Sequence, residues 1–209
     1  MVLTRGLRIA AFLAVFLGAP SWIMATSVQA QPSQARGLVG TTILLVRHAE
    51  KPAEKSGGPG LIPAGEARAR AYADYFRNFS FDGVPLHIDT LVATRDSRGS
   101  MRPRLTVEPF SRASGLPIQQ PFADDDVKEL ADWIAGGAPH RTILIAWHHG
   151  KMPQLLTALG ADPATLLPDS KWPPETYDWV LYLHYGEDGH LSVSRRIVEP
   201  AGLANPSSN

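Results

Sequence analysis

One short stretch constrains the fold of this chain more than any other: residues 43–46, Ile-Leu-Leu-Val, followed directly by Arg47 and His48. An unbroken apolar run with β-branched members is typical of a strand that is covered on both faces in a parallel sheet. Open α/β sheets bind ligands outside the carboxyl ends of their strands, which is where Arg47 and His48 stand. The position alone therefore predicts an internal strand that leads into a site.

The residue types at this strand end suit phosphoryl chemistry. A neutral imidazole can attack phosphorus, and a guanidinium offers paired donors to phosphoryl oxygens. An isolated Arg-His pair also ends many strands without any function, so other stretches must decide. Residues 142–147, Thr-Ile-Leu-Ile-Ala-Trp, form a second strong strand pattern that ends in His148 and His149. Adjacent residues alternate faces if a strand persists, so we expect only one of these two histidines to enter a shared pocket.

The remaining patterns alternate between helices and strands. The first helix should open at Pro63, with Arg68 and Arg70 mostly on its outer face. The order of elements predicts one α/β domain, a three-layer α/β/α sandwich with a mostly parallel central sheet. We expect helices over about 63–79, 103–114, 127–135 and 152–159, and further strands over 88–93, 116–120, 177–183 and 191–197.

The N-terminal residues resemble a targeting signal. Arg5 and Arg8 precede the apolar stretch 9–17, and the small residues around Ala30 suit signal peptidase. We interpret 1–30 as a cleaved signal peptide; the alternative is an uncleaved membrane anchor, although Gly and Pro interrupt the stretch before it reaches the ~20 apolar residues of a spanning helix. The expected divisions are a flexible lead-in at 31–41, the folded domain at 42–199 and a disordered tail at 200–209 that frays from Glu199.

Composition excludes several classes of function. The chain has no Cys, so disulfides, thiolate metal sites and a Cys nucleophile are unavailable. Its 20 basic and 20 acidic residues give no electrostatic argument for binding nucleic acid or an anionic membrane surface. No carboxylate or further His stands at metal-ligand spacing near His148 and His149, so we expect neither a metal nor another cofactor.

Four segments together resemble the histidine phosphatase superfamily, which has the phosphoglycerate mutase-like fold. Residues 45–50 are similar to its Arg-His signature, and 61–69 resemble the Gly-x-x-Arg-Ala segment that opens the first helix. Arg102 and Thr106 resemble the Arg-x-x-x-Thr of the second helix, which follows a strand ending in Ser or Thr, here Thr94. Residues 145–150 resemble the strand that ends in the second catalytic His. The four matches occur in order and cover most of the mature chain.

The resemblance implies a role for each matched residue. His48 would take the phosphoryl group as a phosphohistidine, while Arg47, Arg102 and His149 would bind its oxygens, and water would then hydrolyse the intermediate. His149 is preferred because members with a Trp-Glu-His ending carry the catalytic His third, which leaves His148 as the alternative. The stretch from Thr94 to Arg102 is longer than in many members, so Arg95 or Arg98 could replace Arg102 in the pocket.

No motif fixes the general acid. Asp124, Asp125 and Asp126 lie where mutase-like members supply a Glu, and at least one of them should cap the helix that begins at Val127. The candidates for the acid are Asp126 and Asp125, followed by Glu50.

The expected function is the hydrolysis of a phosphate monoester on His48 by a secreted or periplasmic enzyme that uses no metal. The partner would be a small phosphorylated substrate, with no nucleic acid and no stable membrane insertion after signal cleavage. A mutase is the nearest rival within the fold, and a catalytically inactive secreted phosphate-ligand binding protein is the alternative from another class. The Pro- and Trp-rich stretch 168–174 supports a third hypothesis, an envelope interaction protein. The sequence carries no code for the natural substrate or the oligomeric state.

Overall fold

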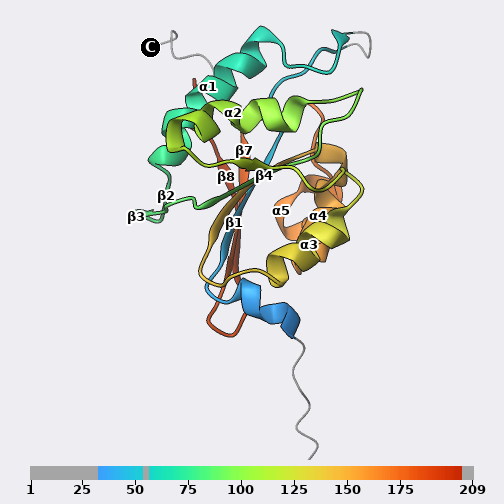
Figure 1. The fold of residues 1–209 in the computed structure, drawn as a ribbon. Helices are drawn as coiled ribbons and strands as arrows, with labels where there is room; N and C mark the ends of the chain where they lie inside the picture. The colour runs from blue at the N-terminus through green and yellow to red at the C-terminus, as the bar shows by residue number, and fades with distance from the viewer. Residues whose placement is uncertain (1–32, 54–56, 204–209) are drawn as a thin grey trace, which may run out of the picture. The chain divides into compact units, whose positions relative to one another are not determined.

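The computed structural model describes residues 33–53 and 57–203, which form a six-stranded sheet between two layers of helices (Figure 1). The strand order is β5-β4-β6-β1-β7-β8. The first four of these run parallel, while β7 is antiparallel to β1 and β8 is antiparallel to β7. The strands are β1 (Thr42–Arg47), β4 (Thr90–Ala93), β5 (Ile118–Gln119), β6 (Thr142–Trp147), β7 (Trp179–Tyr185) and β8 (Leu191–Val198).

The helices cover both faces of this sheet. Helices α1 (Pro63–Arg77) and α2 (Arg102–Ser114) pack on one face and contact each other. Helices α3 (Val127–Ala135), α4 (Met152–Ala158) and α5 (Pro163–Leu166) lie on the opposite face, as Figure 1 shows. The predicted three-layer α/β/α sandwich with a mostly parallel sheet is therefore confirmed.

The central residues of strand β1 are all apolar because the strand is buried on both faces. Ile43 and Leu45 belong to the core cluster shared with α3 and α4, while Leu44 and Val46 belong to the cluster shared with α1 and α2. All four side chains are fully buried. A strand with a helix layer on each side has no solvent face, so alternation of apolar and polar residues is absent.

Several predicted boundaries differ from the structure. Helix α1 ends at Arg77 instead of residue 79, because a short hairpin of β2 (Ser80–Phe81) and β3 (Val84–Pro85) follows it. Gly83, in the turn of that hairpin, has a φ of 79°, a conformation that favours glycine. The last strands correspond to the predicted hairpin, although β7 begins at Trp179 instead of residue 177.

The predicted lead-in contains a 3-10 helix, η1 (Ser33–Leu38), and Leu38 packs against the α3/α4 core cluster. Two further 3-10 turns, η3 (His149–Lys151) and η4 (Pro168–Ser170), lie within connections that face the site. The predicted signal peptide at 1–30 and most of the predicted tail, from residue 204 on, lie outside the described residues. Within 33–53 and 57–203, no helix has the length and apolar character that crossing a membrane requires.

Candidate active site

The two histidine-bearing strand ends lie side by side because β1 and β6 are neighbours in parallel register. Arg47 is paired with Trp147, and the His48 N–H donates to the Trp147 carbonyl at 3.0 Å. Two segments about a hundred residues apart therefore end at the same level of the sheet. The imidazole of His48 consequently lies close to those of His148 and His149, with ring centroids 5.5 and 6.2 Å away.

The His48 imidazole is held neutral and in one orientation. Its Nδ1–H donates to the Ala49 carbonyl at 2.7 Å, because a carbonyl oxygen can only accept. Burial lowers the pKa of His48 to about 3, and the nearby Arg47 contributes in the same direction. The ring is therefore uncharged near neutral pH and carries its lone pair on Nε2, the atom that can attack an electrophile.

The turn after His48 is fixed by the helices on one face of the sheet. The Ala49 N–H donates to the hydroxyl of Thr106 at 2.8 Å, and that hydroxyl donates to the Arg102 carbonyl. Helix α1 approaches the turn so closely that a Cβ on Gly65 would lie 2.4 Å from the Glu50 carbonyl oxygen. Gly65 and Thr106, both in the segments that resemble the superfamily, thus shape the backbone next to His48.

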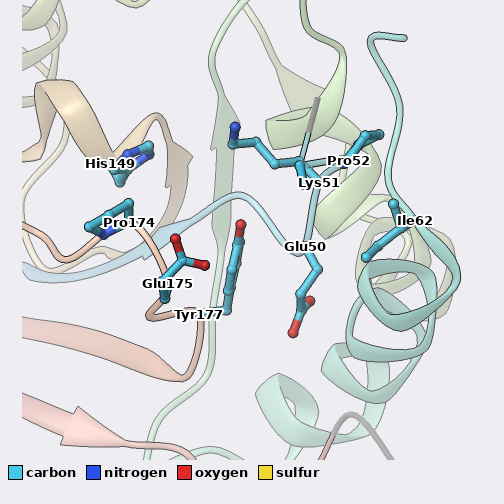
Figure 2. A pocket seen from close by; sticks show the side chains of 9 residues that line it. Glu50, Lys51, Pro52, Ile62, His149, Pro174, Glu175 and Tyr177 are labelled. Atoms are coloured by element: carbon cyan, nitrogen blue, oxygen red, sulfur yellow. The ribbon is translucent and has the colours of Figure 1, made fainter. Parts of the chain in front are cut away.

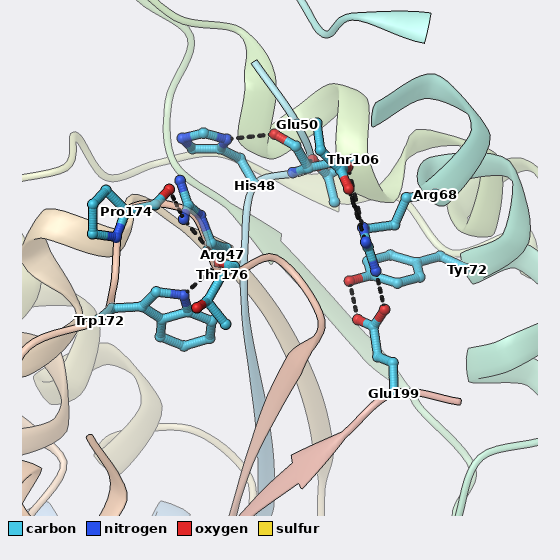
Figure 3. Close-up of polar contacts among 11 residues, drawn as sticks. Arg47, His48, Glu50, Arg68, Tyr72, Thr106, Trp172, Pro174, Thr176 and Glu199 are labelled. Carbon is cyan, nitrogen blue, oxygen red and sulfur yellow. Dashed lines mark hydrogen bonds and ion pairs between the residues drawn. The ribbon is translucent and has the colours of Figure 1, made fainter. Parts of the chain in front are cut away.

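A buried ionic network continues from this turn (Figure 3). The Arg68 guanidinium donates to both oxygens of the Glu50 carboxylate at 2.8–3.1 Å and also pairs with Glu199. Glu199 in turn accepts a hydrogen bond from the Tyr72 hydroxyl. Burial raises the pKa of Glu199 to about 7. One guanidinium therefore connects the His48 turn with the end of β8.

This network corrects two sequence predictions. Arg68 does not lie mostly outside α1, since it is only 8% exposed and serves two carboxylates. Glu199 does not fray, because it is only 4% exposed and anchored by Arg68 and Tyr72. Helical periodicity places charged residues on the solvent face by default, and it cannot recognise a partner more than a hundred residues away.

Arg47 lies beside His48, and part of its guanidinium makes no hydrogen bond to the described residues. Its Nη1 donates to the carbonyls of Pro173, Pro174 and Thr176, and its guanidinium carbon stands 3.8 Å from the centre of the Tyr177 ring. Its Nε and Nη2 atoms are buried and have no hydrogen-bond partner among the described residues. Burial lowers the pKa of Arg47 to about 10, which still leaves it charged at neutral pH. Two buried N–H donors without an acceptor suit an anionic ligand.

Both candidate second histidines reach the site, which differs from the expectation that only one would. The strand ends at Trp147 and η3 begins at His149, so the two residues do not alternate faces as they would in a continuing strand. His148 bonds through Nε2 to the Ser100 hydroxyl at 3.1 Å, and the buried Nδ1 atoms of both His148 and His149 have no hydrogen-bond partner among the described residues. Burial lowers the pKa of both, that of His149 to about 4.

Of the arginines predicted around residue 100, Arg102 is the one that lines the cavity with His48. Its guanidinium donates to the carbonyls of Gly58 and Gly60 at 2.8 and 3.1 Å, which ties it to the loop before α1. Arg95 instead donates to the Pro121 carbonyl and faces Asp126 at 3.5 Å. Arg98 is exposed and does not line this cavity.

The carboxylate that lines the cavity is not one of those predicted as the general acid. Asp124 lines the cavity with His48, and its Oδ2 lies 3.9 Å from Nδ1 of His148. Asp125 pairs outside with Lys151, and Asp126 accepts the Ala123 N–H at 2.9 Å. Asp126 stands at the N-cap of α3 but makes no side-chain cap, so the predicted capping role is wrong for this residue. Glu50 is engaged by Arg68, which leaves Asp124 as the carboxylate that lines the His48 cavity among the described residues.

Two adjoining cavities meet at His149. The first, of about 310 Å³, is lined by His48, Arg102, Asp124, His148, Lys51 and Lys151. The second, of about 340 Å³ and shown in Figure 2, shares Lys51 and His149 with the first and adds Glu50, Ile62, Glu175 and Tyr177. Sequence reasoning missed Glu175 and Tyr177, because no motif marks the loop before β7, and it missed Lys51, which stands just after the Arg-His segment at 45–50.

The donor set of the site suits an anion better than a cation. Guanidinium, ammonium and imidazole groups surround the first cavity, whereas oxygen ligands are few. Among residues 33–53 and 57–203, no group of three or more His, Asp or Glu side chains is arranged to hold a metal ion.

Comparison with solved structures identifies the fold. A structure assigned as the phosphohistidine phosphatase SixA of Agrobacterium tumefaciens matches with a TM-score of 0.50 at 22% identity, over 77% of this chain and 99% of that one. A protein histidine phosphatase SixA complexed with tungstate also matches at 0.50, with 16% identity over 75% of this chain and 96% of that one. No protein-family model matches the sequence. A search of curated proteins finds no match either.

The chain has the fold of these two structures, which is the predicted phosphoglycerate mutase-like fold. The recognition from four sequence segments is thereby confirmed at the level of fold. Two SixA structures are its neighbours in architecture, and the activity of this chain is argued below from its own residues.

Proposed function

We propose that this protein is a metal-independent phosphatase that hydrolyses phosphate monoesters through a phosphohistidine on His48. The observation that carries the proposal is the pairing of a neutral, oriented imidazole with buried N–H donors on Arg47 that have no partner among the described residues. The first group can form a bond to phosphorus and the second can hold phosphoryl oxygens.

In the first step, Nε2 of His48 attacks phosphorus, and the bond from phosphorus to the ester oxygen breaks. Arg47, Arg102 and His149 stabilise the charge on the three phosphoryl oxygens. Asp124 donates a proton to the departing alkoxide, since its carboxyl lines the same cavity as His48. The products of this step are the free alcohol and phosphorylated His48.

In the second step, water attacks phosphorus while the Asp124 carboxylate accepts its proton. The bond from Nε2 to phosphorus breaks, inorganic phosphate leaves, and His48 returns to its neutral form. The hydrogen bond from Nδ1 to the Ala49 carbonyl holds the same ring orientation through both steps.

The test is a brief incubation of the mature protein with a labelled phosphate monoester in the presence of a chelator, followed by rapid quenching at alkaline pH. We expect an acid-labile label on His48, and turnover that is lost in His48→Asn. Binding of the ester without any covalent label or product would instead identify a phosphate-ligand binding protein of the same fold.

We further propose that residues 1–30 are a secretion signal and that the enzyme acts in the periplasm or outside the cell. The support is the order of basic, apolar and small residues in this segment. N-terminal sequencing of the exported protein should begin at Gln31. A start at Met1 in membrane-bound material would favour the anchor.

A further inference from the structure

The two cavities share Lys51 but differ in the other charges that line them. The cavity that contains His48 is lined by Arg102, Lys51 and Lys151, and Asp124 is its one carboxylate among the described residues. The cavity beside Tyr177 is lined by two carboxylates, Glu50 and Glu175. In Figure 2 the Tyr177 ring stands between these two side chains, and the Lys51 amino group points away from both. The site is therefore positive where the phosphoryl group reacts and carries negative charge next to it.

Glu175 differs from Glu50, although its charge also acts to raise the pKa of the buried Arg47. Glu50 is already paired with Arg68, whereas Glu175 is exposed and makes no ion pair with any residue in 33–53 or 57–203. A free carboxylate next to an anion-binding site opposes the binding of a phosphate dianion. Its presence is accounted for if the bound molecule places a positive charge against it.

We propose that the cavity beside Tyr177 holds the alcohol portion of the substrate, and that Glu175 selects phosphate monoesters whose alcohol carries an ammonium group. This inference rests on the proposed phosphatase function. The two cavities share Lys51 and His149, so a phosphoryl group beside His48 and an alcohol beside Glu175 belong to one continuous site. Arg47 covers one face of the Tyr177 ring at 3.8 Å, so the carboxylate, more than the ring, recognises the cation.

The test compares choline phosphate with 3,3-dimethylbutyl phosphate, its uncharged carbon isostere, so that only the cationic charge differs. We expect a KM for choline phosphate about threefold to fivefold lower, the range that an exposed ion pair provides. Glu175→Gln should abolish this preference, and Glu175→Lys should reverse it. Glu129→Gln, which removes the same charge from an exposed position of α3, should retain the preference for choline phosphate.

Equal KM values for the two esters with the wild-type protein would overturn the inference, as would an unchanged preference in Glu175→Gln. The proposed phosphatase function would survive either result, because the neutral ester would still be hydrolysed. Absence of hydrolysis of both esters, together with no phosphate on His48, would overturn the phosphatase function and this inference with it.

Discussion

The hydroxyl of Thr106, on helix α2, accepts the backbone N–H of Ala49 at 2.8 Å, immediately after His48. The Ala49 carbonyl in turn accepts the His48 Nδ1–H. The side chain of Thr106 therefore helps to fix the orientation of the His48 imidazole through a single residue, Ala49.

Thr106→Val should lower both stability and activity. The substitution keeps the shape of the side chain but leaves the buried Ala49 N–H without an acceptor, a loss of about 1–3 kcal/mol. We expect kcat to fall more than KM changes, because the ring of His48 loses its fixed orientation. Thr106→Ser, which retains the hydroxyl, is the control for denaturant unfolding and steady-state kinetics. Equal kcat values in the two variants would show that the contact is structural only.

His149→Ala should reduce turnover much more than His148→Ala. Both rings lie near His48, but His149 lines both cavities, whereas Nε2 of His148 is bonded to Ser100. Single-turnover rates with an aryl phosphate measure the difference. The opposite order would assign the second imidazole to His148.

Asp124→Asn should have an effect that depends on the leaving group. An alkoxide needs a proton from the enzyme, whereas a nitrophenolate departs readily without one. We expect a loss of about 100-fold or more with alkyl phosphates and a much smaller loss with p-nitrophenyl phosphate. Asp125→Asn and Asp126→Asn are matched controls, since their carboxylates are occupied by Lys151 and by the Ala123 N–H. Equal losses with both classes of ester would remove Asp124 from the role of acid.

Arg68→Ala should destabilise the fold by about 3–5 kcal/mol, because it leaves the buried Glu199 without its cation. Adding Glu199→Gln to this variant should restore part of the loss, since a neutral amide needs no counter-charge. Urea unfolding of the two single variants and the double variant measures this coupling. Strictly additive losses would mean that the pair contributes no interaction free energy.

Glu199 should also make stability depend on pH. Burial raises the pKa of its carboxyl to about 7 in the folded protein, from 4.5. The folded state therefore holds this proton more tightly than the unfolded chain does. The resulting stabilisation is complete below pH 4.5 and is lost as the pH rises through about 7. Glu199→Gln cannot titrate, so its free energy of unfolding should increase relative to the wild type between about pH 5 and about pH 8. A difference that does not change with pH would contradict the raised pKa.

The sequence predicts those features that depend on local patterns. Residues 43–46 and 142–147 have the composition of buried parallel strands, and each ends in histidine, so the fold and the meeting of His48 with a second imidazole follow from them. The positions of His148 and His149 are less predictable, because they depend on whether the strand continues past Trp147. The structure ends the strand there, and both rings reach the site.

Contacts between residues that lie far apart in the chain could not be predicted from the sequence. In the sequence, Arg68 has the pattern of a solvent-exposed helix residue. In the structure, Glu199, just after β8, pairs with it. Likewise, the sequence alone does not distinguish three consecutive aspartates. The turn that contains them places Asp124 in the cavity, whereas Asp125 pairs with Lys151 and Asp126 accepts the Ala123 N–H. Glu175 lies in an irregular connection without any periodic signal, and Tyr177 has a strand pattern although β7 begins only at Trp179.

The contact between Arg68 and Glu199 spans 131 positions of the chain. The ribosome synthesises His48 early, but this contact can form only after β8 has been synthesised and has paired with β7. Shortened chains that stop before residue 199 would contain every proposed catalytic group and still lack the ion pair of Arg68 with Glu199. The turn that bears His48 therefore gains this support only when the last strand is in place.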